Sequence, residues 1–125
     1  MAIHFRKVEF KQRQTRVLKE LDRLGLDGLL MFRQESMYYL SGYDSFGYAM
    51  FQCFYLGADG RMILLTRAPD LAQAELTSII DDIRIWKDEA GMEPTQNLKQ
   101  LLRELGCENK NLGIENQYYL QNIKE

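Results

Sequence analysis

The residues that could act as nucleophiles or transition-metal ligands are few and far apart in this sequence. His4 is the one histidine, and the two cysteines are Cys53 and Cys107. A nucleophile needs a base within hydrogen-bond reach, and a catalytic metal needs several ligands that converge from rigid elements. Asp81 and Asp82 are adjacent, so on a strand their side chains would point to opposite faces of the sheet. The sequence therefore predicts no catalytic residue and no metal site in this chain.

A phosphate-binding turn is not expected either. Nucleotide-binding α/β folds place glycines directly after the first strand, where the backbone must approach phosphate at a helix N-terminus. Here the corresponding turn is 33–36, which contains no glycine and carries Glu35, whose charge would repel phosphate. Ser36 is predicted to cap the short helix that follows.

The composition is that of one soluble domain. The chain has 125 residues, of which 46% are hydrophobic, and its 16 basic and 18 acidic side chains give a net charge of −2. Such a small charge produces no strong field toward nucleic acid or an anionic membrane, so neither is expected as a partner. The sequence has no signal-peptide pattern and no run long enough to span a bilayer, and two cysteines make no disulfide framework. We expect a cytoplasmic protein with reduced thiols.

Periodicity and turn signals predict an α/β domain with a mixed sheet. Helices are expected at residues 8–24, 35–41, 69–78, 95–105 and, at the end of the chain, 118–123. Strands are expected at residues 29–32, 48–56, 61–66, 83–86 and 112–115. The turn at 58–60 joins two of these strands as an antiparallel hairpin, which interrupts the alternation of strand and helix. Gly25, Gly42 and Gly106 are predicted to end their helices.

An aromatic loop is the candidate binding feature. Tyr43 and Phe46 flank the dipeptide 44–45 between the short helix and the next strand, and Tyr48 follows at the start of that strand. Loops between regular elements often carry binding residues. Two interpretations stay open: these rings contact a ligand or partner, or they pack in the core.

The order of these elements and three of their segments resemble the N-terminal domain of the creatinase, prolidase and aminopeptidase P family. The segments are Gly-Leu-Asp-Gly-Leu-Leu-Met-Phe at 25–32, Tyr-Tyr-Leu-Ser-Gly-Tyr at 38–43 and the hairpin at 56–67. The resemblance extends from about Val8 to Glu115. It implies a single domain over residues 1–125, with a mixed β-sheet of about five or six strands and helices on both faces.

The resemblance also implies a function. In that family this domain precedes a "pita-bread" catalytic domain, which is absent from this chain. That domain holds two divalent metal ions such as Mn, Co or Zn, or no metal ion if the parent is creatinase-like. The expected partners are the protein's own C-terminal catalytic domain and a second subunit in a homodimer. The lip over the neighbouring active site matches 42–48, which gives Tyr43, Phe46 and Tyr48 a substrate-lid role.

Two function classes follow from these observations. The first is a non-catalytic N-terminal domain of a metal-dependent C–N hydrolase that acts on an X-Pro peptide, creatine or a similar small amide. The alternative is a self-standing α/β binding or interaction module whose ligand site is the aromatic loop. An autonomous enzyme is disfavoured by the single histidine and the scattered nucleophiles.

Overall fold

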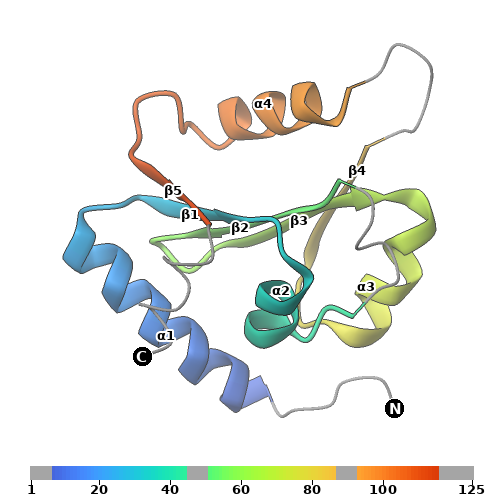
Figure 1. The fold of residues 1–125 in the computed structure, drawn as a ribbon, viewed down its shortest axis with the longest axis horizontal. Helices are drawn as coiled ribbons and strands as arrows, with labels where there is room; N and C mark the ends of the chain where they lie inside the picture. The colour runs from blue at the N-terminus through green and yellow to red at the C-terminus, as the bar shows by residue number, and fades with distance from the viewer. Residues whose placement is uncertain (1–6, 45–50, 87–92, 116–125) are drawn as a thin grey trace.

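The computed structural model describes residues 7–44, 51–86 and 93–115, which form a five-stranded mixed sheet between two helical layers (Figure 1). In chain order the elements are α1 (Lys7–Leu24), β1 (Gly28–Met31), α2 (Gln34–Ser41), β2 (Cys53–Gly57), β3 (Met62–Arg67), the 3₁₀ turn η2 (Ala68–Asp70), α3 (Leu71–Thr77), β4 (Asp82–Trp86), α4 (Pro94–Glu104) and β5 (Leu112–Ile114). Helices α1, α2 and α3 lie on one face, and α4 covers the other. The α/β class, the mixed sheet and the helices on both faces are confirmed.

The strand order is β4-β3-β2-β1-β5, and only β2 runs against the others. It pairs antiparallel with both β1 and β3, whereas β5 is parallel to β1 and β4 is parallel to β3. The carboxyl ends of β1, β3, β4 and β5 therefore meet at one edge of the sheet. That edge is where an α/β sheet usually binds its ligands or partners.

Alternation along the strands builds two apolar layers. In β1, Leu29 and Met31 face α1, α2 and α3, whereas Leu30 faces α4. The stripe predicted on α4 is present, since Leu101 is buried and its neighbours on the stripe pack on the same layer: Leu98, Leu102 and Leu105. Strands that are covered on both faces have continuous apolar sequences, and β1 is an example.

The helix ends follow the glycine signals. Gly25 has φ +70°, and the N–H of Leu26 donates to the carbonyl oxygen of Leu21 at 2.9 Å, so the chain folds back on α1 as expected. Gly42 ends α2 with φ +85° while its N–H donates to the carbonyl oxygen of Tyr38. Left-handed backbone of this kind strongly favours glycine.

Three local predictions need correction or lie outside the described residues. Strand β2 begins at Cys53, because the side chain of Gln52 turns into the core and the carbonyl oxygen of Phe51 accepts a hydrogen bond from Trp86 Nε1 at 3.0 Å. Ser36 does not cap α2: the cap position is Arg33, and Ser36 lies within the first turn. The helix expected at 118–123 lies outside the described residues. Among those that are described, no helix combines the length and hydropathy needed to cross a membrane.

Candidate functional site

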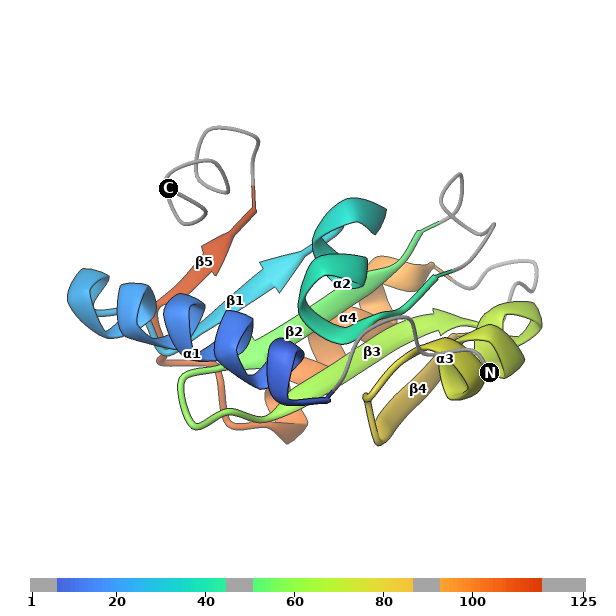
Figure 2. The same cartoon turned by 90° about the horizontal axis from the view of Figure 1, so that it is seen from below.

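The carboxyl-end edge of the sheet gathers polar and aromatic side chains from five elements or from the residues next to them. Figure 2 shows β1 and β5 running side by side in the same direction, with α2 beyond the end of β1. We use the name "carboxyl-end edge" for the following residues: Phe32, Arg33, Gln34, Glu35, Phe51, Trp86 and Glu115. This edge is the part of the described chain whose position in the fold best suits contact with a ligand or partner.

A hollow of about 520 Å³ opens at this edge and is lined by Phe32, Arg33, Gln34 and Glu35. Arg33 Nε lies 3.2 Å from Glu35 Oε2, so the two charges neutralise each other at the rim. Gln34 Nε2 donates to the carbonyl oxygen of Tyr43 at 2.7 Å. Its buried Oε1 has no hydrogen-bond partner among the described residues, which leaves an acceptor open to a donor from outside them.

Three aromatic side chains continue from the hollow across the α4 face of the sheet. The ring centroids of Phe32 and Phe51 are 6.0 Å apart, and those of Phe51 and Trp86 are 6.4 Å apart in an edge-on arrangement. Trp86 is buried, but Phe32 is 38% exposed. We call these three residues the aromatic strip. Ile114, in register with Leu30 and therefore on the same face, extends the apolar surface and is 63% exposed.

The carboxylate of Glu115 occupies the N-terminal end of α2. Its Oε1 accepts hydrogen bonds from the backbone N–H groups of Phe32 and Arg33 at 2.9 and 3.0 Å, and its Oε2 accepts one from Ser36 Oγ. An anion is favourable here because the helix dipole and the unpaired N–H groups both attract negative charge. The turn at which no phosphate site was expected thus binds a carboxylate of its own chain.

Of the three residues predicted to form a lid, only Tyr43 lies among the described residues. Tyr43 is fully buried in the layer beneath α1, α2 and α3, where its hydroxyl donates to Gln52 Oε1 and lies 3.3 Å from Thr66 Oγ1. The ring of Tyr43 therefore packs in the core of this chain instead of facing a substrate. Phe46 and Tyr48 lie outside the described residues, and their lid role stays a prediction.

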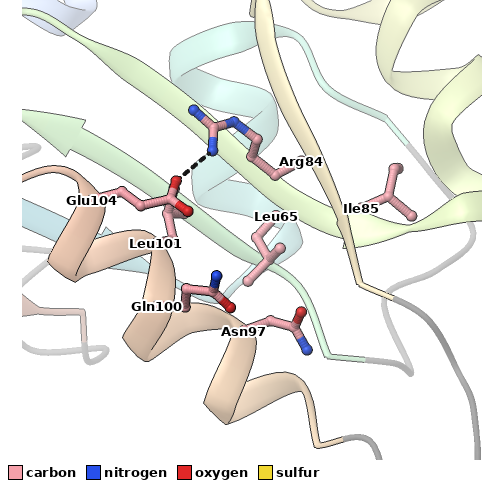
Figure 3. A pocket seen from close by; sticks show the side chains of 7 residues that line it. All are labelled: Leu65, Arg84, Ile85, Asn97, Gln100, Leu101 and Glu104. Atoms are coloured by element: carbon pink, nitrogen blue, oxygen red, sulfur yellow. Dashed lines mark hydrogen bonds and ion pairs between the residues drawn. The ribbon is translucent and has the colours of Figure 1, made fainter.

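A second hollow, of about 220 Å³, lies between β4 and α4 (Figure 3). Its lining includes Arg84, which donates to Asp82 Oδ1 at 2.7 Å and to Glu104 Oε2 at 3.1 Å. The hydrogen bond to Asp82, followed by the one to Glu104, raises the pKa of the Arg84 guanidinium above its ordinary value. The guanidinium is therefore already engaged by two carboxylates, and this hollow offers no strong site for an anion.

Both cysteines are buried and free. Burial, with a smaller contribution from the charge of Glu115, raises the pKa of the Cys53 thiol to about 12. Cys107 Sγ lies 3.9 Å from the Tyr55 hydroxyl, and burial followed by this hydrogen bond raises the pKa of Tyr55 to about 12. The raised pKa makes the Cys53 thiol a poor nucleophile, because the thiolate is the reactive form.

The raised pKa of Cys53 predicts a loss of stability at alkaline pH. The folded state holds the thiol proton to about pH 12, whereas the ordinary value for the thiol is 9.0. The stabilisation is complete below pH 9 and is lost as the pH rises, with a limiting slope of about 1.4 kcal/mol per pH unit for one proton. Denaturant unfolding measured between pH 8 and pH 11 should show a shallower decline for Cys53→Ala than for the parent chain. An equal decline of the unfolding free energy with pH in the two chains would contradict the raised pKa of Cys53.

The described residues do not fit a metal centre. They contain no group of three or more His, Cys, Asp or Glu side chains that could hold an ion, and His4 lies outside them. The two divalent ions that the resemblance implies would need ligands from outside the described residues. Neither cysteine has a histidine beside it in the part of the chain that the structure describes.

Sequence reasoning did not identify Phe32 or Glu115 as residues of the site. Phe32 was predicted as part of a buried strand, and the structure instead places it just beyond β1 with a partly exposed ring. Glu115 was predicted as the last residue of the final strand. The rule that carboxyl ends of parallel strands meet at one edge could have drawn attention to both, but only if the pairing of β1 with β5 were known.

Comparison with known proteins agrees with this architecture. A mixed sheet that carries helices on both faces defines an α/β domain. A model of the Creatinase/Prolidase N-terminal domain family matches residues 13–125. The chain therefore belongs to the creatinase/prolidase N-terminal domain family, which confirms the resemblance. A search of curated proteins found no match.

Solved structures of peptidases share the fold. A dipeptidase from Pyrococcus horikoshii matches with a TM-score of 0.67 and 22% identity over 90% of this chain and 31% of its own. A prolidase from Thermococcus sibiricus matches with a TM-score of 0.73 and 18% identity over 92% and 32%. An Xaa-Pro aminopeptidase structure from Streptococcus pyogenes matches with a TM-score of 0.68 and 21% identity over 95% and 85%. The chain thus spans about a third of the first two proteins.

Proposed function

We propose that this chain acts as the non-catalytic N-terminal domain of a metal-dependent C–N hydrolase of the X-Pro dipeptidase, aminopeptidase P or creatinase type. The observation that carries the proposal is the family match over residues 13–125. The described residues supply no metal-binding group, so bond cleavage would belong to a catalytic domain outside them. A metal-bound water in that domain would be the nucleophile if the parent is a metallopeptidase.

The contribution of this domain would be contact between domains and subunits. The aromatic strip and Ile114 support this proposal, because they form an apolar surface that α4 leaves partly exposed. Aromatic side chains at the centre of an interface commonly provide much of the binding energy. We propose that this surface faces a second subunit in a homodimer or the catalytic domain. A cytoplasmic location is part of the same proposal and fits two buried free thiols.

A lid over the neighbouring active site is the second proposed role. It falls to Phe46 and Tyr48, whose rings could exclude water from a small amide substrate. Tyr43 would take part as the buried anchor that precedes them, since its ring is fixed by Gln52 and Thr66. Support for this role comes from the family resemblance and from the position of Tyr43 at the end of α2.

The contact role predicts that polar substitutions in the apolar surface weaken self-association. In the double variant Phe32→Ser, Ile114→Ser we expect a dissociation constant at least about tenfold higher than in the parent chain, because two exposed apolar side chains are removed from the interface. Sedimentation equilibrium measures this constant directly. The matched control is Leu76→Ser on α3, which removes a side chain that is 59% exposed elsewhere on the surface. A parent chain that stays monomeric, or a control with the same loss, would contradict a role of this surface in contact between subunits.

A self-standing binding module is the alternative function. It is favoured by the hollow of about 520 Å³ and by Gln34, which lines the hollow and has a buried acceptor without a partner among the described residues. Calorimetry of the chain with small amides, nucleotides and sugars tests it. Binding that Gln34→Leu abolishes would support the module, whereas no heat of binding with any of these ligands would leave the hydrolase domain as the better account.

A further inference from the structure

Helix α2 is held at both ends by side chains that are remote in sequence. At its N-terminal end the carboxylate of Glu115 accepts hydrogen bonds from the N–H groups of Phe32 and Arg33 and from Ser36 Oγ. These contacts join residues that are 79 to 83 positions apart. Because a charged acceptor with neutral donors forms a stronger hydrogen bond than a neutral pair, this is the firmest polar link between β5 and the start of α2.

The C-terminal end of α2 is held by α1. Gln14 Nε2 donates to the carbonyl oxygen of Leu40 at 2.8 Å, and Arg13 Nη1 donates to that of Tyr39 at 2.9 Å. The Arg13 guanidinium also lies over the Tyr39 ring, 4.6 Å from its centroid. A negative group at the N-terminus and a positive group at the C-terminus both complement the helix dipole. Both ends of the eight-residue helix are therefore held by side chains from outside it.

Helix α2 contacts the residues that follow it, 42–44, in two ways, and we call these residues the Tyr43 segment. Gln34, in the first turn of α2, donates to the carbonyl oxygen of Tyr43 at 2.7 Å. At the other end, Gly42 continues directly into Tyr43, whose N–H donates to Ser41 Oγ at 3.2 Å. A shift at the start of α2 is therefore transmitted to Tyr43 through a side chain and through the backbone.

Strand β5 depends on Glu115 because its own pairing is short. It has three residues, and within the part of the chain that the structure describes it pairs with β1 alone. The last ladder bond is the one from the N–H of Glu115 to the carbonyl oxygen of Leu30, at 2.9 Å. Short edge strands fray easily, so the carboxylate contacts add to the backbone pairing that holds Glu115 at the end of β5.

We propose that Glu115 is a positioning residue: by binding the start of α2, its carboxylate fixes the end of β5 against that helix and couples it to the Tyr43 segment. In the function proposed above, this would tie the placement of the catalytic domain to the Tyr43 segment. That consequence depends on the proposed function, whereas the coupling within this chain does not.

The experiment compares Glu115→Ala with Glu115→Gln in this chain by backbone NMR. In Glu115→Ala, amide exchange at Phe32 and Arg33 should become at least about tenfold faster, because their acceptor is lost. The amide signals of Gly42 and Tyr43 should shift as well, although both lie at the far end of α2. Glu115→Gln should return both measurements to the values of the parent chain. Its carbonyl oxygen can accept hydrogen bonds from the two N–H groups, and its amide can donate one to Ser36.

Chemical rescue provides a second readout of the same site. Sodium acetate, compared with sodium chloride at equal ionic strength, should slow exchange at Phe32 and Arg33 in Glu115→Ala and leave the parent chain unchanged, because acetate can occupy the vacated anion position. If Glu115→Ala does not fold, Ser36→Ala removes one donor and gives the same comparison at the Tyr43 signals.

The proposal is wrong if the changes stay confined to residues 32 and 33, or if Glu115→Gln behaves like Glu115→Ala. Neither result depends on hydrolysis or on subunit association. Failure of the coupling can therefore be told apart from failure of the proposed function.

Discussion

The substitution Gly42→Ala is expected to lower the free energy of unfolding by about 3 kcal/mol, the sum of a left-handed backbone cost and an overpacking cost. Gly42 has φ +85°, so any side chain there is strained. In addition, a Cβ atom would lie 2.6 Å from the carbonyl oxygen of Thr77 and 3.0 Å from Cζ of Phe10. The first neighbour is backbone and the second is a buried ring, so neither can move without disturbing the core.

The matched control for this prediction is Gly25→Ala. Gly25 has a similar φ of +70°, but a Cβ atom there would meet no atom within 4 Å. Its cost should therefore be the backbone term alone, about 1 kcal/mol. Urea unfolding followed by circular dichroism gives both values, and the difference between them isolates the steric term. Equal losses for the two variants would contradict the close packing of Gly42 on Thr77 and Phe10.

The substitution Tyr43→Ala is expected to destabilise the chain by about 3–5 kcal/mol, which is the range for removing a fully buried aromatic ring. Tyr43 is 0% exposed and packs with Phe54, Leu64 and other residues of the layer beneath α1, α2 and α3. Removing the ring leaves a cavity, and it also removes the hydroxyl that binds Gln52. The substitution therefore has two separate energetic costs, the cavity and the lost hydrogen bond.

Tyr43→Phe separates these two costs. It keeps the ring and removes only the hydroxyl, so the expected loss is about 1–2 kcal/mol. Thr66 Oγ1 still donates to Gln52 Oε1 at 3.1 Å in that variant, which limits the penalty. Thermal unfolding of both variants supplies the comparison. A loss below about 1 kcal/mol for Tyr43→Ala would mean that the ring is not part of the core.

The sheet and its helical layers could be predicted because their signals are local. Leu98, Leu101, Leu102 and Leu105 repeat with helical spacing, and the structure packs them on one layer. The hairpin turn fixes β2 against β3, and Gly42 ends α2 as its lack of a Cβ suggests. In each case the deciding interaction joins residues only a few positions apart.

The site could not be predicted to the same depth because its contacts join distant segments. Glu115 binds a turn that lies more than 80 residues earlier in the chain, and nothing near Glu115 in the sequence indicates that contact. The aromatic strip likewise brings together the ends of β1 and β4 and the residues before β2. Tyr43 shows the opposite case. Its position in a loop suggested a binding residue, but in the structure its ring is buried between α2 and the sheet.

The most direct test of the central claim is an activity measurement on the protein recovered from its source cells. We predict that material precipitated with an antibody to this chain hydrolyses an X-Pro dipeptide or creatine when Mn²⁺ is supplied, whereas the purified chain of 125 residues does not. The account would be contradicted if the purified chain alone hydrolysed either substrate, or if the precipitated material hydrolysed neither.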